Sequence, residues 1–150
     1  MAWVSPSSVS TGDLMTAATW NQDVVANTIA LLPGALEFFI DGGGIAIATG
    51  LKGGLEAPMK CTIDRCSIGL DQSATFTVDI WKDTYANYPP TDADTITAAN
   101  EPGTSAATKD QDSVLSGWTT SIAAGDWLFF NIDANDNATW VLISLKVSRS

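Results

Sequence analysis

The chain has 150 residues, enough for one domain with a hydrophobic core of its own. Apolar residues make up 45% of the sequence and charged residues only 16%, a globular composition that excludes a largely disordered chain. Seven basic residues against 17 acidic ones give a net charge of −10, which repels phosphate backbones and anionic lipid. We therefore expect the chain to bind no nucleic acid and no membrane.

The first residues carry no targeting signal, because they contain neither a cluster of positive charge nor a long apolar run. The most apolar stretch, residues 28–40, is interrupted by Pro33 and Gly34 and is too short to span a bilayer. We therefore expect a protein that is made in a cytoplasm and stays there until something releases it.

Residues 1–15 are small, polar and without periodicity, which predicts an extended arm. Near its start, Trp3 and Val4 look like anchors for a groove on a partner. The period changes to 3.6 residues at Thr16, whose hydroxyl can cap a helix, and Pro33 would end that helix. The sequence thus predicts an arm and one short helix over residues 1–33.

The predicted helix, residues 16–32, carries two apolar stripes. One stripe includes Trp20 and Val24, and the other is formed by Val25, Ile29 and Leu32. Because a lone surface helix needs only one apolar stripe, we expect this helix to be covered on two sides. Two alternatives stay open: the helix packs on its own β domain, or it packs partly on neighbouring subunits.

After Pro33 the apolar period becomes two, which is typical of strands. This alternation predicts strands near residues 36–40, 51–55, 59–70, 76–80, 128–132 and 138–148. Between Met59 and Leu70 the apolar parity changes, so we expect a bulge at Asp64 and Arg65 that restores one inward face. The pattern predicts an all-β domain over residues 34–150: an antiparallel, jelly-roll-like β-sandwich preceded by the arm and the short α-helix.

Two features do not fit an isolated sandwich. Large apolar side chains occupy outward positions of the last two strands, where they need cover from loops, the helix or another subunit; they are Trp127, Phe129, Trp140 and Leu142. The second feature is the long connection from Asp83 to about Gln111, which holds few aliphatic residues. Connections of this length are usually functional or contain short elements, and residues 95–97 could form one short edge strand.

Cys61 and Cys66 lie five residues apart on one predicted strand. Their Cα atoms would stand roughly 16 Å apart at the usual rise of a strand, beyond the limit of roughly 7 Å for a disulfide. We expect two buried, reduced thiols. The chain has no histidine and no third cysteine, so a zinc site lacks its ligands.

The sequence offers little catalytic chemistry. The absence of histidine excludes Ser-His-Asp and Cys-His pairs and a histidine general base. Four candidate carboxylates lie on an outward strand face or in the long connection, where acids are ordinarily solvated: Asp79, Asp83, Asp92 and Asp94. We expect no catalytic residues, no enzyme activity and no cofactor.

The segment Asp133–Asn137 imitates the start of a calcium loop. However, Ala138 stands where that loop requires glycine, and Ser144 stands where it requires glutamate. Clusters of Asp and Asn also make tight strand connections. We interpret the segment as a hairpin turn and predict no metal site, with an accidental cation site as the alternative.

Two stretches resemble known proteins. Residues 11–27, TGDLMTAATWNQDVVAN, resemble an N-terminal element of many small tailed-phage virion proteins, in which an arm and a helix precede a β domain. Residues 78–91, VDIWKDTYANYPPT, and residues 117–126, GWTTSIAAGD, resemble a β module of phage and prophage structural proteins. The resemblance indicates that the protein is part of a phage particle, and it does not indicate where in the particle the protein lies.

Such modules are typically trimeric jelly rolls, so the resemblance implies a non-enzymatic homotrimer of the virion, assembled in the host cytoplasm. In decoration (cement) proteins of this kind an arm lies across capsid subunits, which makes the major capsid protein the expected partner. In tail fibres the same module would form the receptor-binding tip. A fibre needs a shaft, for which this length leaves no room, so we favour capsid decoration. The alternatives are a tail or baseplate component and a carbohydrate-binding module that uses Trp81, Tyr85 and Tyr88.

The expected partner contacts follow from the apolar positions that the predicted fold leaves unburied. An exposed large side chain forfeits roughly 1.5–3 kcal/mol of transfer free energy, which association can recover. The predicted partner-binding residues are Trp3, Val4, Trp20, Val24, Trp127, Phe129, Trp140 and Leu142.

Overall fold

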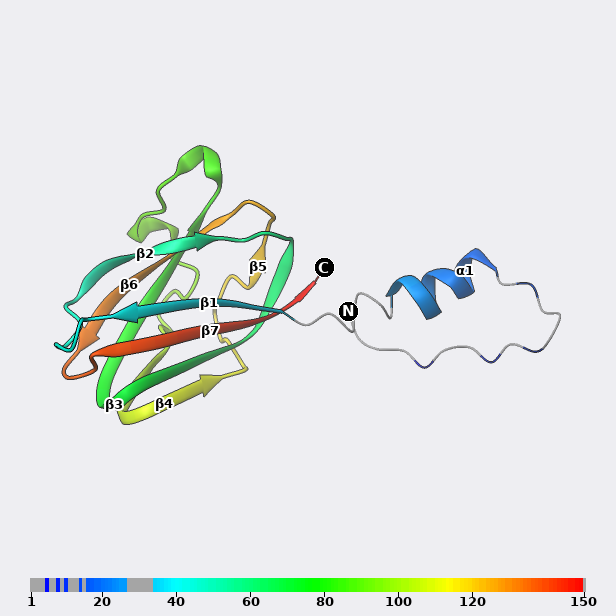
Figure 1. Cartoon of the computed structure of the whole chain (residues 1–150). Coiled ribbons are helices and arrows are strands. Elements are labelled where there is room, and N and C mark those ends of the chain that lie inside the picture. Colours follow the sequence, from blue (N-terminus) through cyan, green and yellow to red (C-terminus); the bar gives the residue numbers. More distant parts are fainter. Residues whose placement is uncertain are drawn as a thin grey trace.

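The computed structural model describes Ser5, Ser8, Ser10, Leu14 and residues 16–26 and 34–149 (Figure 1). Its helices are α1 (Ala17–Trp20), the π-helix η1 (Asn21–Ala26) and the 3₁₀ turns η2 (Tyr85–Asn87) and η3 (Asp92–Asp94). Its strands are β1 (Gly34–Asp41), β2 (Gly50–Glu56), β3 (Cys61–Asp83), β4 (Gly103–Asp112), β5 (Ser121–Ile122), β6 (Trp127–Asn135) and β7 (Trp140–Arg149). No described helix is long and apolar enough to cross a bilayer.

All pairings in the sheet are antiparallel, and the strand order is β1-β7-β3-β6-β2, with β4 and β5 also pairing with β3. The first half of β3 pairs with β7 up to Leu70, and its second half pairs with β6 from Phe76 onward. The curled sheet therefore forms a first layer (β1, β7 and the first half of β3) and a second layer (β2, β6 and the second half of β3). The first strand lies beside the last and the second beside the next to last, which confirms the predicted all-β, jelly-roll-like sandwich.

Strand β3 corrects one prediction, because the sequence pattern indicated two separate strands where the structure has a single strand of 23 residues. The even-numbered residues of this strand face inward from Cys66 to Ile80, and Cys66, Leu70, Ala74 and Ile80 are buried. The strand thus bends around the core without changing its inward face. The predicted bulge is confirmed, since the pairing with β7 shifts register between Ile63 and Arg65.

The core is made from the inward positions of both layers. Phe130 of the second layer stacks on Phe38 of the first, with ring centroids 4.6 Å apart and an interplanar angle of 7°. The predicted inward residues of β6 and β7 are buried: Leu128, Phe130, Ile132, Val141, Ile143, Leu145 and Val147. At roughly 1.5–3 kcal/mol for each large apolar side chain, this burial is the main stabilising term of the β domain.

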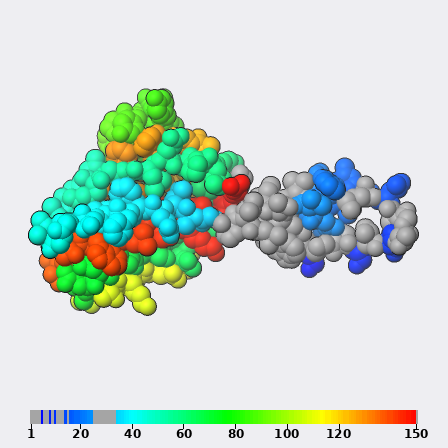
Figure 2. Space-filling model, viewed as in Figure 1, coloured from blue at the N-terminus to red at the C-terminus, as the bar shows by residue number. Residues whose placement is uncertain are grey.

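The N-terminal helix begins as predicted. The Thr16 hydroxyl oxygen accepts a hydrogen bond from the backbone N–H of Thr19 at 3.1 Å, which caps α1. Trp20 is 52% exposed and Val24 is 37% exposed, and the helix lies apart from both layers of the sandwich (Figures 1 and 2). Neither layer gives it the expected cover. The predicted end at Pro33 and the anchors Trp3 and Val4 lie outside the described residues.

Candidate functional site

The long connection after β3 covers the outer face of the second layer. Tyr88 makes edge contacts with two outward rings of β6, Trp127 at 5.0 Å and Phe129 at 5.6 Å between ring centroids. Phe129 is only 6% exposed, and Trp127 is half-buried. Of the three covers that the sequence left open for these rings, the structure shows a loop, because the chain's own Tyr88 packs against both. A partner contact of Trp127 and Phe129 stays a prediction.

Asp79 fastens the same connection to β3. Its carboxylate accepts hydrogen bonds from the indole N–H of Trp81 at 2.6 Å, from the hydroxyl of Thr95 at 2.6 Å and from the hydroxyl of Thr97. Asp79 is buried, which corrects its assignment as a solvated acid. The three donors replace the water that burial removes from the carboxylate.

The predicted edge strand at residues 95–97 is reduced to one bridge between Thr95 and Trp81. The neighbouring Ile96 donates its backbone N–H to the Ile80 carbonyl at 2.8 Å. The short turns η2 and η3 lie in the same connection, so the prediction that it contains short elements is confirmed. Strand β4, which is mostly exposed, occupies the last part of the predicted connection and was not predicted.

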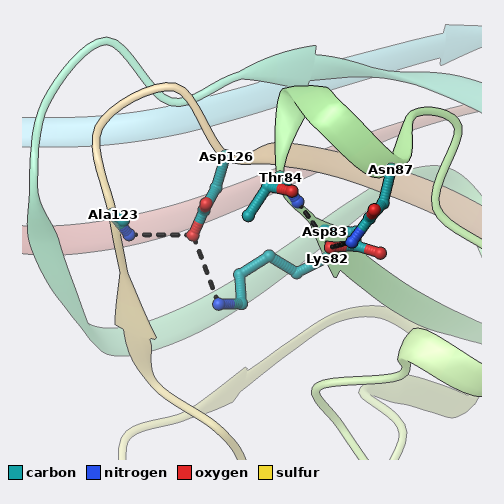
Figure 3. Close-up of polar contacts among 6 residues, drawn as sticks. All are labelled: Lys82, Asp83, Thr84, Asn87, Ala123 and Asp126. Atoms are coloured by element: carbon teal, nitrogen blue, oxygen red, sulfur yellow. Dashed lines mark hydrogen bonds and ion pairs between the residues drawn. The ribbon is translucent and has the colours of Figure 1, made fainter.

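Polar contacts also fix the root of the connection (Figure 3). The ammonium of Lys82 lies 3.2 Å from a carboxylate oxygen of Asp126, which also accepts the backbone N–H of Ala123 at 2.9 Å. Asp83 accepts the backbone N–H of Thr84 at 2.6 Å and the side-chain N–H of Asn87 at 3.1 Å. The Thr84 hydrogen bond lowers the pKa of Asp83 most, followed by that of Asn87. These carboxylates are occupied by contacts within the chain.

Glu101 and Asp133 form a carboxyl pair where the connection ends against β6. Burial raises the pKa of Glu101, and the charge of Asp133 raises it further. Burial also raises the pKa of Asp133, and the charge of Asp79 adds to the rise. Their mutual interaction raises the pKa of Glu101 and lowers that of Asp133, whereas the charge of Asp79 raises the pKa of both groups.

The segment 133–137 forms the end of β6 and the hairpin turn to β7. The Asn135 side chain closes this turn, because it donates to the Ala138 carbonyl at 2.9 Å and accepts the Ala138 backbone N–H at 3.0 Å. Within residues 16–26 and 34–149, no three Cys, Asp or Glu side chains are grouped so that they could hold a metal ion.

The outer face of the first layer carries an apolar surface that nothing covers in the described part of the chain. We call Phe39, Trp140 and Leu142 the outer strip. They are 57%, 38% and 37% exposed, respectively. Phe39 lies opposite Leu142 in the β1–β7 register, and its ring centroid is 5.8 Å from that of Trp140.

Asp71 on β3 holds the start of β7, where the outer strip begins. It accepts hydrogen bonds from Thr139, through its hydroxyl at 2.7 Å and its backbone N–H at 2.9 Å, and from the backbone N–H of Trp140 at 3.3 Å. The hydroxyl bond is the main cause of the lowered pKa of Asp71. The backbone that carries Trp140 is therefore fixed.

The predicted partner-binding residues separate into three groups. Trp140, Leu142, Trp20 and Val24 are exposed, Trp127 and Phe129 are covered by Tyr88, and Trp3 and Val4 lie outside the described residues. Sequence reasoning missed Phe39, although its outward parity between Glu37 and Asp41 was a visible signal. Of the aromatics proposed for sugar binding, Tyr85 and Tyr88 are exposed, whereas the indole N–H of Trp81 is bonded to Asp79.

Both cysteines are free and buried, as predicted. Burial raises the pKa of the Cys66 thiol to about 12, and Asp112 and Asp110 add to the rise. Burial also raises the pKa of Cys61. Burial therefore favours the protonated, weakly nucleophilic form of both thiols.

The chain matches no protein family and no curated protein. Among solved structures it is similar to a chain in the structure of infectious bursal disease virus, Gx strain, with 14% sequence identity and a TM-score of 0.32. The similarity covers 76% of this chain and 32% of that chain, so the present chain spans about a third of its length. At this TM-score the similarity carries no argument about function.

Proposed function

We propose that the chain is a non-enzymatic structural protein of a tailed-phage particle and that it decorates the capsid. One observation carries the proposal: a capped helical segment with exposed Trp20 and Val24 precedes a jelly-roll-like domain whose core, among the described residues, is drawn from residues 36–147. A helical segment whose apolar side chains do not pack on their own domain is suited to packing on another molecule. The same residues carry the resemblance to the N-terminal element of small phage virion proteins.

The state of the carboxylates supports a structural role. Asp79 and Asp126 are buried and bonded within the chain, and Asp83 is held by Thr84 and Asn87. Asp79 and Asp83, two of the four carboxylates weighed in the sequence, thus hold the long connection in place. These carboxylates bond to groups of the same chain, as structural carboxylates do.

The proposed partners are other copies of the chain, in a homotrimer, and the major capsid protein. A trimer carries three times the net charge of −10, so a second acidic surface would repel it. Attachment through apolar groups, including Trp3 and Val4 of the arm, avoids this repulsion. The proposed location is the virion, with assembly in the host cytoplasm.

A tail fibre, baseplate or receptor-binding component is the second candidate, and a carbohydrate-binding module is the third. Both draw on the exposed Tyr85 and Tyr88 of the protruding connection. A receptor or glycan could reach these rings without disturbing the core. A glycan array tests the third candidate directly.

Heating intact particles and particles stripped of the protein tests decoration. Stripped particles should break at a lower temperature, because a cement protein joins neighbouring capsid subunits. Attachment should survive a change from about 0.05 to 0.5 M salt, since apolar contacts are not screened as surface charges are. Stripped particles that resist heat equally but fail to adsorb to host cells would favour the tail component instead.

A further inference from the structure

Two apolar surfaces of the described chain have no cover. One is the helical face, Trp20 and Val24, which lie four residues apart and so project from the same side of a helix. The other is the outer strip on β1 and β7. The helix lies off the end where β1 begins, whereas the strip lies towards the opposite end, where β1 reaches Asp41 and β7 starts at Trp140 (Figure 1).

The shape of the outer strip suits a single helix. Phe39, Leu142 and Gly69 lie opposite one another on three adjacent strands, so this row is about 10 Å wide. A Cβ placed on Gly69 would have no atom within 4 Å, so the surface is open there. A helix with its side chains is about 10–12 Å in diameter. A side chain of a partner can therefore approach the backbone at Gly69.

Charge indicates what can occupy the strip. Residues 16–26 contain one charged residue, Asp23, in a chain of net charge −10. On the outer face of the first layer, Lys109 pairs with Gly69 and Lys146 pairs with Arg65, but the exposed acids Glu37 and Asp41 lie on either side of Phe39. The outer face of the second layer instead carries Glu101 and Asp133, whose pKa values are raised. A second copy can therefore place its helix, residues 16–26, on the strip and bring only one acidic residue, Asp23, to this surface.

We propose that the helical face of one copy packs on the outer strip of a second copy. The contact joins two different surfaces, so it runs head to tail and closes into a ring when the rotation permits. Three copies give the homotrimer, in which each subunit donates one helix and accepts another. The inference rests on the self-association in the proposed function and is independent of attachment to a particle.

A disulfide between the two surfaces tests the proposal on the isolated protein. The variant carries Val24→Cys and Leu142→Cys in one chain, and it is oxidised at micromolar concentration. The native Cys61 and Cys66 are buried and do not compete. We expect covalent trimers on a non-reducing gel. The matched control pairs Val24→Cys with Val114→Cys, which is exposed and lies beyond the end of β4 at Asp112, and should give no covalent trimer.

Two results overturn the proposal. A monomer that has lost two hydrogens would show that the helix occupies the strip of its own chain. Absence of any disulfide between the two positions would show that the surfaces do not meet. Sedimentation provides the second measurement: Leu142→Lys should weaken association at least tenfold, whereas Val114→Lys should not. Because no particle is involved, a failure here leaves the decoration test unaffected.

Discussion

At the scale of single residues, Asp79 carries the attachment of the long connection. Asp79→Ala would leave the Trp81 indole and the Thr95 and Thr97 hydroxyls without their acceptor. A buried donor left unsatisfied costs about 1–3 kcal/mol, so we expect the variant to lose about 3 kcal/mol or more of unfolding free energy. Urea denaturation measures the loss. Asp110→Ala, which removes an exposed acid of β4, should stay within about 0.5 kcal/mol of the parent chain; equal stability of the two variants would contradict the role of Asp79.

The carboxyl pair of Glu101 and Asp133 makes stability depend on pH. Because the fold raises both pKa values, it favours the protonated forms, and their stabilising contribution is present below the ordinary carboxyl pKa values. That contribution is lost as the pH rises through the raised values, where two like charges face each other. Asp133→Asn should therefore stabilise the protein near neutral pH, by less than about 1 kcal/mol for such exposed groups.

The gain from Asp133→Asn should shrink as the pH falls towards the ordinary carboxyl range, because both groups are then neutral in the parent chain. Unfolding free energies between about pH 4 and 7 measure this change. Asp110→Asn, an exposed acid on another strand, is the control and should show no comparable trend. A gain that is constant with pH would mean that the pair is not the cause.

At the scale of the elements, close approach of strands makes some glycines irreplaceable. A Cβ on Gly54 of β2 would collide with the Leu128 carbonyl oxygen and the Phe129 ring on β6. Gly54→Ala should cost about 1–3 kcal/mol, since strands β2 and β6 would have to separate. The control is Gly34→Ala, whose Cβ would lie 3.5 Å from a Val147 methyl carbon, an ordinary contact. Thermal unfolding at one protein concentration compares the two; similar midpoints would contradict the described packing of β2 on β6.

Alternation predicted most strands because their buried residues follow a period of two. It did not show that β3 is continuous, although the even-numbered positions from Cys66 to Ile80 keep one inward face through the bend. Gln72 interrupts the series of inward apolar residues between Leu70 and Ala74. Because connections between strands also lack such residues, the sequence pattern suggested two strands. Strand β4 was missed for the opposite reason: it is an edge with few buried side chains, so its sequence carries no alternation.

The candidate surfaces were predictable only in part. Outward parity identified Trp140 and Leu142 correctly, and it placed Trp127 and Phe129 on an outer face as well. The alternation of residues along a strand could not show that Tyr88, some forty residues earlier in the chain, covers the rings of Trp127 and Phe129. The contact depends on how the long connection folds, and no local pattern of residues encodes that path.

At the scale of the whole molecule, we predict that folding and attachment belong to different segments. Among the described residues, the core cluster is drawn from positions between Leu36 and Val147, and we therefore expect the β domain to fold without the arm. A variant that lacks residues 1–15 should unfold in urea with an unchanged midpoint and should fail to bind stripped particles. Co-sedimentation measures the binding. Normal binding by this variant would refute the anchoring role predicted for Trp3 and Val4.

The two layers also differ in what they present to the surroundings. The outer strip of the first layer is uncovered in the described residues, with both acids (Glu37, Asp41) and bases (Lys109, Lys146) around it, whereas Tyr88 of the long connection covers the outward rings Trp127 and Phe129 of the second layer. A particle protein needs one side for neighbours and another for solvent. This asymmetry agrees with the first layer as the side for self-association and the second as the side that faces solvent.

The central claim, that this chain decorates a phage capsid, is tested most directly by its copy number in purified particles. Quantitative mass spectrometry of the particle, referenced to the major capsid protein, gives that number. The claim predicts a count in simple proportion to the capsid subunits, since a decoration protein occupies repeated sites over the shell. A count in proportion to the tail proteins instead, or absence of the chain from the particle, would contradict it.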